Sequence, residues 1–212
     1  MNCDDLITID EINKLYTFDM LGNNLEKVKP RIRKNDCIDS RCPENTTSYA
    51  PVLTQNSKEV WLDLYANNVP SLLKHCCIVN EYCFTQTHKK VVIIQGITLD
   101  DKLRGNKILS TIFQKQKRFY RKKNFSKIVL TATNSGLIVW HRLGFKYAQK
   151  RDELKILKSL NEYLQEVHGE TKRYKSIIEV KPELLYGSKE NENFTDWLMK
   201  HNVNHIKMIM EL

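Results

Sequence analysis

The sequence of 212 residues has no long hydrophobic run. No stretch approaches the roughly 18 consecutive apolar residues that a membrane-spanning helix needs. The first ten residues, MNCDDLITID, are acidic where a secretory signal would be basic and then apolar. We therefore expect a soluble, cytoplasmic protein without a membrane partner.

The usual metal and nucleotide signatures are also missing. The six cysteines form no C-x-x-C pair, and Cys37 and Cys42 have no matching His pair downstream. This pattern favours free, reduced thiols over a zinc site, and we expect no bound metal. Neither G-x-x-x-x-G-K-[ST] nor G-x-G-x-x-G occurs, which argues against a Walker A loop and a dinucleotide-binding fold.

What the chain does have is an ordinary composition with an excess of positive charge. Hydrophobic residues make up 41% and charged residues 28%, so a core can form. The formal net charge is +9 and the sequence pI is about 9.2. Such an excess favours an anionic partner: nucleic acid, an anionic membrane surface or a polyphosphate ligand. Charge alone does not choose among them.

From residue 75 onward, apolar runs alternate with helical spacing, which predicts strands interleaved with helices. Strands are expected over 75–85, 91–99, 127–133, 144–148, 174–180 and 205–212. Helices are expected over 108–121, with Ile108, Ile112, Phe113 and Phe119 on the apolar face, and over 136–142, 152–167 and 194–201. The expected stripe of the helix 152–167 is Leu154, Leu157, Leu160, Tyr163, Leu164 and Val167.

The run VVIIQGITL at 91–99 is the most apolar stretch of the chain. A continuous apolar run is typical of a central strand that is covered on both faces. Gly96 lies inside this run, which predicts a bulge or a close approach by another group.

The N-terminal quarter is less regular. A helix is expected over 8–21, with Thr8 or Asp10 as its N-cap. The polar stretch 35–55 is expected to be a loop. A second helix is expected to begin at Ser57, because apolar residues follow it at helical spacing.

The loop DDKLRGNK at 100–107 stands between the strand 91–99 and the helix 108–121. The first amides of a helix lack internal partners and lie at the positive end of its dipole, where a pyrophosphate fits. Arg104 and Lys107 add positive charge there. A strand–loop–helix turn with one glycine is common, so this signal is weak by itself.

The second half of this region carries a more specific pattern. The strand KIVLTAT is followed by SGLIVWHRLGFKYA, with the hexapeptide W-H-R-L-G-F at 140–145, and the chain ends on IKMIMEL. Together with the loop, these segments resemble the GNAT superfamily of acyl-CoA N-acyltransferases. The resemblance covers about 76–148 and the last eight or so residues. It implies a mixed α/β fold: a central twisted, mostly antiparallel sheet with one splayed parallel strand pair, and helices on both faces.

The resemblance also implies a division of the chain. Residues 1–57 would be an N-terminal helix and irregular segment of the same domain. The core would comprise 58–148 and 204–212. The segment 149–203 would be an insertion between the last two strands, forming an acceptor-site lid or a partner-binding element.

The phosphate loop departs from the family pattern Gln/Arg-x-x-Gly-x-Gly/Ala. Arg104 occupies its first position, Lys107 and Leu109 stand where the two small residues belong, and Gly105 is at a variable position. A register starting at Lys102 would spoil the match of the helix that follows. Without the glycines, the backbone approaches a pyrophosphate less closely. Cofactor binding would then be weakened or reshaped.

The resemblance implies transfer of an acetyl group from acetyl-CoA to a primary amine. The pantetheine arm would lie between the strands 91–99 and 127–133. The expected cofactor-binding residues are Ile97 and Leu99 through their main chain, then Arg104, Gly105, Asn106, Lys107, Ile108, Leu109, Ser110, Asn134 and Trp140.

The chemistry needs a deprotonated amine, a polarised carbonyl and a proton for the departing thiolate. Trp140 stands where the family usually has a tyrosine acid, and tryptophan has no titratable proton at neutral pH. The neighbouring His141 and the strand residue Glu81 are therefore the candidate catalytic residues. Asp100 and Asp101 fit the capping of the loop better than a role as bases.

The acceptor stays open among a protein, a polyamine, an amino sugar and an aminoacyl-tRNA. A run of basic residues has two readings, a solvated helix face or a contact with nucleic acid or another polyanion. Its members are Lys115, Lys117, Arg118, Arg121, Lys122 and Lys123, interleaved with Phe119, Tyr120 and Phe125. A catalytically weak or inactive GNAT-like binding module and a nucleic-acid-binding protein without coenzyme A remain the alternatives.

Overall fold

The computed structural model is of a mixed α/β protein, the class expected from the sequence. It describes residues 6–16, 25–34, 52–66, 76–85, 89–99, 108–133, 136–186, 193–203 and 205–212. The chain divides into two compact units. The first comprises Met1–Val129 and Glu211–Leu212, and the second comprises Leu130–Met210.

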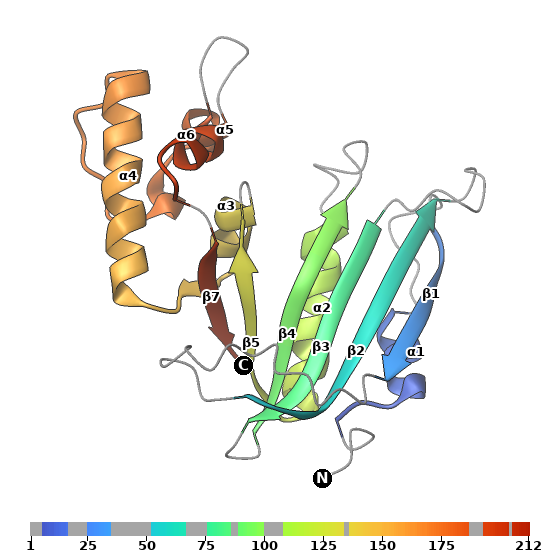
Figure 1. Ribbon diagram of the computed structural model, residues 1–212. Helices are drawn as coiled ribbons and strands as arrows, with labels where there is room; N and C mark the ends of the chain where they lie inside the picture. The colour runs from blue at the N-terminus through green and yellow to red at the C-terminus, as the bar shows by residue number, and fades with distance from the viewer. Residues whose placement is uncertain are drawn as a thin grey trace. The chain divides into compact units, whose positions relative to one another are not determined.

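The first unit contains four antiparallel neighbours in chain order (Figure 1). They are β1 (Leu25–Lys34), β2 (Val52–Ala66), β3 (Cys76–Thr85) and β4 (Lys90–Leu99). The strand β1 pairs with β2 alone in the strand order, and it contains Pro30. Proline lacks an N–H to donate, which suits an edge strand.

The next strand in the order after β4 is β5 (Phe125–Ala132), reached through the helix α2 (Ile108–Lys122). The first residues of β4 and β5 lie together: Ser126 Oγ donates to the Lys90 carbonyl at 3.0 Å, and the Lys90 ammonium is 5.9 Å from the Phe125 ring centroid. Two neighbouring strands that start at the same edge and are joined by a helix are parallel. This confirms a mixed sheet with one parallel pair. Since 130–132 belong to the second unit, the splaying of the pair stays a prediction.

The helix expected from Ser57, and the loop expected up to residue 55, are wrong where the structure describes them. Residues 52–66 form β2, in which Val60 pairs with Ile32 on one side and Asn80 on the other. The spacing of Val60 and Trp61 with the apolar residues after them fits a helix, but β-branched and aromatic residues also favour strands. Pairing with two distant strands decides the conformation. Residues 35–51 lie outside the described part.

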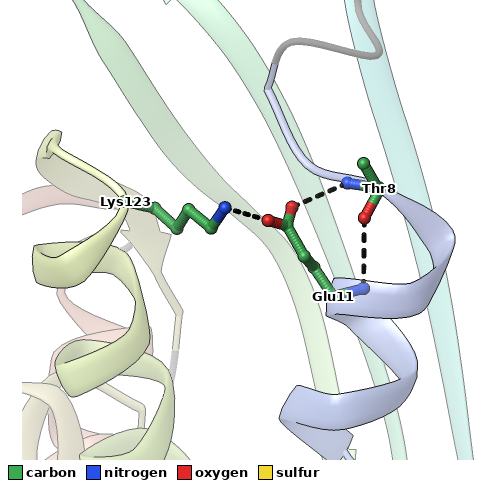
Figure 2. A network of polar contacts seen from close by, with 3 residues as sticks. All are labelled: Thr8, Glu11 and Lys123. Atoms are coloured by element: carbon green, nitrogen blue, oxygen red, sulfur yellow. Dashed lines mark hydrogen bonds and ion pairs between the residues drawn. The ribbon is translucent and has the colours of Figure 1, made fainter.

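The short helix α1 (Ile9–Tyr16) begins with a capping box. Thr8 Oγ1 accepts from the Glu11 amide at 3.2 Å, and Glu11 Oε2 accepts from the Thr8 amide at 2.9 Å. The other carboxylate oxygen of Glu11 pairs with Lys123, just after α2 (Figure 2). Thr8, and not Asp10, is therefore the cap, and one carboxylate ties the start of α1 to the end of α2. Residues 17–21 of the expected helix lie outside the described part.

The core of the first unit lies between α2 and the sheet. Ile112 and Phe113 are buried, as expected, and so is Tyr120. The hydroxyls of Tyr82 and Tyr120 are 2.9 Å apart, and Asn80 Nδ2 donates to the Tyr120 hydroxyl at 3.3 Å. Asn80 and Tyr82 thus face α2, and strand alternation turns the residue between them to the opposite face.

The second unit contains the remaining helices and the last two strands. They are α3 (Gly136–Arg142), β6 (Lys146–Tyr147), α4 (Lys150–His168), a 3₁₀ turn (Ile177–Glu179), α5 (Pro182–Tyr186), α6 (Phe194–Lys200) and β7 (Ile206–Glu211). The strands β6 and β7 pair antiparallel, and β7 follows β5 in the strand order. In the part of the chain that the structure describes, no helix is long and apolar enough to cross a membrane.

Two expectations for the second unit are wrong. The strand expected over 174–180 is a bend and a 3₁₀ turn, because the Asn161 side chain bonds both the N–H and the C=O of Tyr174, and the Ser176 hydroxyl caps the turn. Leu154, expected in the buried stripe of α4, is 57% exposed, and Ile156 is buried instead.

Candidate functional site

The strand β4 carries a bulge at Gln95. Across the β3–β4 ladder, Asn80 pairs with Ile94 and Val79 pairs with Gly96, so Gln95 is one residue too many. A bulge bends its strand and increases the local twist. Among the described residues, a Cβ added to Gly96 would meet nothing within 4 Å. The bulge expected from the glycine is confirmed.

The bulge also decides which main-chain groups of β4 face away from β3. The Lys90 carbonyl accepts from Ser126 of β5, so Lys90 faces the β5 side. Along an antiparallel ladder, pairs bonded to each other alternate with pairs whose polar groups point outward. Counting from the Phe84–Lys90 pair, the outward positions at the end of β4 are the partners of Ile78 and Cys76, namely Ile97 and Leu99. Without the extra residue they would be Gly96 and Thr98.

Glu81 lies beside this bulge on the face of the sheet opposite α2. It pairs with Ile93 in the ladder, is partly exposed, and accepts a hydrogen bond from Gln95 Nε2 at 2.5 Å. The bulge residue and the candidate base are thus joined. Its partial exposure leaves the Glu81 carboxylate accessible from solvent, as a general base requires.

The first turn of α2 contains no acidic residue, so no carboxylate within it competes for an anion at the positive helix end. Leu109 is half-buried and Ser110 is exposed. Arg104, Gly105, Asn106 and Lys107 lie outside the described residues, as do Asn134 and the side chains of Leu99 and Ile108. Their roles in cofactor binding stay predictions.

The hexapeptide W-H-R-L-G-F is a helix ending. The Phe145 amide donates to the Trp140 carbonyl at 3.1 Å, and the Gly144 amide donates to the His141 carbonyl at 3.0 Å. Gly144 has φ +97°, in the region that favours glycine. These are the two bonds of a Schellman motif, and its usual hydrophobic contact is the edge-to-face packing of Trp140 on Phe145, with ring centroids 5.2 Å apart.

Trp140 is buried, with 7% of its surface exposed. Its indole Nε1 lies 3.4 Å from the position of a Cβ at Gly136. The ring therefore packs within the second unit, against the start of its own helix and against Phe145. The pattern that carries the family resemblance is accounted for by the way α3 ends.

His141 has a bond at each ring nitrogen. Nδ1 is 3.0 Å from the Phe145 carbonyl, and Nε2 is 3.4 Å from Ser176 Oγ. Burial lowers the pKa of His141 below its ordinary value, opposed by the bond to Phe145 and by the charge of Glu153. In the neutral ring, Nδ1–H donates to the carbonyl and Nε2 accepts from the hydroxyl. His141 thus links the end of α3 to the 3₁₀ turn, and its catalytic role stays a prediction.

Sequence reasoning did not single out Tyr147. Its ring lies 5.1 Å from that of His141, and its buried hydroxyl has no hydrogen-bond partner among the described residues. Burial, and then the charge of Glu153, raise the pKa of Tyr147. It is therefore a protonated phenol next to a neutral imidazole. A tyrosine two residues beyond the hexapeptide carries no sequence signal of its own.

No three His, Cys, Asp or Glu side chains of the described residues come together as a metal site would require. Cys37 and Cys42 lie outside that part of the chain. The thiol of Cys83 is buried and donates to the Val91 carbonyl at 3.8 Å.

The chain was compared with known proteins at the level of sequence and of structure. No family model and no curated protein matches the sequence significantly. Three solved structures to which the chain is similar are acetyltransferases. Nourseothricin acetyltransferase is 12% identical, with a TM-score of 0.37, over 73% of this chain and 65% of its own.

The other two structures contain coenzyme A derivatives. Naa50 of Arabidopsis thaliana, in complex with the bisubstrate analogue CoA-Ac-MVNAL, is 17% identical, with a TM-score of 0.35, over 41% of this chain and 57% of its own. A GNAT family acetyltransferase from Elizabethkingia anophelis with acetyl-CoA bound is 12% identical, with a TM-score of 0.36, over 87% of this chain and 98% of its own. The chain spans less than two thirds of the first two proteins. All three TM-scores are below 0.5, so these similarities do not establish the activity of this chain.

Proposed function

We propose that the protein is an N-acetyltransferase of the GNAT type, which transfers an acetyl group from acetyl-CoA to a primary amine. The observation that carries this proposal is the bulged end of β4. The main-chain N–H and C=O groups of Ile97 and Leu99 occupy the positions of the ladder that face away from β3. A strand needs such outward groups to pair with a pantetheine arm. The arm has amide N–H and C=O groups that complement such an edge.

The start of α2 supports the same proposal. The helix α2 is the next element of the chain after β4. One ligand could therefore place its pantetheine arm along β4 and its pyrophosphate at the start of α2. The first turn of α2 has no acidic residue. Arg104 and Lys107 would add positive charge, while Ser110, which is exposed, would offer a hydroxyl.

In the reaction, the amine attacks the thioester carbonyl, and the sulfur leaves as a thiolate that takes up a proton. Glu81 would accept the proton that the attacking amine releases. Burial lowers the pKa of His141, and in the neutral ring Nδ1–H would donate to the Phe145 carbonyl, with the phenol of Tyr147 beside it. We propose that Glu81 is the general base. The proton that the thiolate takes up would come from His141, from the neighbouring Tyr147 or from solvent. The segment 149–203 would form the acceptor-site lid and set the choice of amine.

Titration with acetyl-CoA in a thermal-shift assay tests the cofactor. A ligand at about 100 times its Kd stabilises a protein by about 2.7 kcal/mol, so the Tm should rise clearly. No shift at millimolar acetyl-CoA would remove the proposal. A shift without thiol release across a panel of peptides, polyamines and amino sugars would favour the binding-module alternative.

A pair of loop variants tests the placement of the pyrophosphate. Arg104→Glu should weaken acetyl-CoA binding by at least about tenfold, because it reverses a charge at the phosphates. Lys102→Glu makes the same change in net charge two residues earlier and should weaken binding less. Equal losses for the two variants would contradict the Arg104 register, while leaving the cofactor itself in place.

A further inference from the structure

An unusually long stretch of the chain contains no acidic residue. From Lys102 to Arg151 there are fourteen Lys and Arg and no Asp or Glu, whereas the chain as a whole has 25 acidic residues. The densest part of this stretch is α2 and the turn that follows it. The described residues there include Lys115, Lys117, Arg118, Arg121 and Lys122.

These five side chains share the solvent face of α2. Arg118, Arg121 and Lys122 are exposed, and Lys115 and Lys117 are partly exposed. At 100° per residue they fall on one arc, opposite the buried positions. The buried positions are Ile112, Phe113, Gln116 and Tyr120. Lys123 is engaged elsewhere, because it pairs with Glu11.

The fold does not require this arrangement. A basic residue stabilises a helix only in its last turn, which accounts for Arg121 and Lys122. Lys117 and Arg121 are four residues apart, as are Arg118 and Lys122, and like charges at this spacing repel and destabilise a helix. These like-charge pairs destabilise the helix, and neutral residues at the same positions would stabilise it. Their presence therefore indicates a role in binding.

The proposed cofactor does not account for the face either. Its phosphates would lie at the first turn of α2, and a helix of 15 residues is about 22 Å long. Arg118 and Arg121 lie about 15 and 20 Å along the helix from its first residue, Ile108. A pyrophosphate at the first turn of α2 therefore does not account for the charges at this end of the helix.

The side chains on and near the basic face of α2 limit the classes of partner that it can bind. The rings of Tyr120 and Phe125 are buried and Phe119 is half-buried, so these aromatic side chains do not form an exposed platform on which bases could stack. The large hydrophobic side chains that are exposed in the described part all belong to the second unit. They are Leu154, Ile178, Tyr186 and Met199. Among the described residues, the basic face of α2 therefore offers no exposed large apolar side chain for membrane insertion or for the centre of a protein interface.

We propose that the solvent face of α2 binds the phosphodiester backbone of a nucleic acid without reading its sequence. Lysine and arginine on an exposed helix neutralise phosphates and release condensed counterions, which needs neither stacking nor base contacts. This inference is independent of the acetyltransferase proposal.

Fluorescence anisotropy with a labelled 20-nucleotide single-stranded RNA and a 20-base-pair DNA duplex tests it between 50 and 200 mM salt. The variant Lys117→Gln/Arg118→Gln/Arg121→Gln should bind at least about tenfold more weakly at 100 mM salt, and its slope of log K against log[salt] should be shallower by about two to three. Its thermal shift with acetyl-CoA should equal that of the wild type.

The matched control is Lys155→Gln/Arg173→Gln/Lys181→Gln, which removes three exposed charges from the second unit. It should keep wild-type affinity and slope. Circular dichroism should show both variants folded. Equal losses in the two variants, or no binding by the wild type at 50 mM salt, would overturn the proposal. So would equally tight, α2-dependent binding of polyglutamate or of anionic vesicles, which would assign the face to an acidic protein or to a membrane.

Discussion

Gly144 holds the backbone at φ +97°, and it lies at the position of the Schellman motif that glycine prefers. A Cβ there would also stand 3.4 Å from Met210 Cε of β7. We expect Gly144→Ala to lower the free energy of unfolding by about 1 kcal/mol or more, because alanine is strained at positive φ. Urea denaturation measures this. Gly96→Ala is the control and should be neutral or stabilising, since its Cβ meets nothing within 4 Å. Equal losses would contradict the role of backbone conformation.

His141 makes stability depend on pH. Burial lowers its folded-state pKa below the ordinary 6.5, so the unfolded chain takes up a proton first as the pH falls. The free energy of unfolding should therefore be highest above pH 6.5 and should decrease as the pH falls from 6.5 through the lower, folded-state pKa. Urea denaturation at pH 7.5 and pH 5 should show a smaller decrease for His141→Gln than for the wild type.

The control for the pH experiment is His205, which is exposed and adopts φ +56°. Asparagine tolerates this conformation, so His205→Asn keeps the backbone. It should retain the pH dependence of the wild type. If His141→Gln also retains it, another group is responsible.

Among the elements, α1 is short and depends on its ends. Eight residues form a marginal helix without tertiary support. The capping box satisfies two of its amides, and Glu11 serves both the box and the ion pair with Lys123. Thr8→Ala should lower the free energy of unfolding of the first unit by about 1 kcal/mol. Thr8→Ser should restore most of this, since it keeps the hydroxyl. Hydrogen exchange of the α1 amides reports the same loss locally, and unchanged protection in Thr8→Ala would contradict the capping role.

The elements from β3 onward could largely be predicted because their apolar runs are long and their turns are polar. The strands β1 and β2 could not be predicted. The strand β1 is highly charged and contains Pro30, and the two strands are held by pairing between residues some thirty positions apart in the chain. Near residue 177, side-chain hydrogen bonds of Asn161 and Ser176 stabilise a 3₁₀ turn where a strand was expected. The bonds of Asn161 form only because α4 brings its side chain next to Tyr174. Local pattern does not contain such contacts.

At the scale of the whole molecule, the elements around the candidate site could be predicted, while the roles of its residues stay predictions. The strand 91–99, the helix that follows it in the chain, the bulge near Gly96 and the helix at 136–142 could be predicted from the sequence. The outward positions of Ile97 and Leu99 depend on where the extra residue falls in the β3–β4 ladder. Tyr147 became visible only through its packing on His141. The register of the β3–β4 ladder and the packing of Tyr147 depend on strand pairing and burial, which cannot be predicted from a single sequence.

The ending of α3 has a consequence for descent. Trp140, Gly144 and Phe145 are held in place by the need to stop a helix and fold its end back. Selection for a stable chain would preserve them whether or not the protein transfers acetyl groups. In related sequences, these three residues would therefore report how the helix ends, and not which chemistry the protein performs.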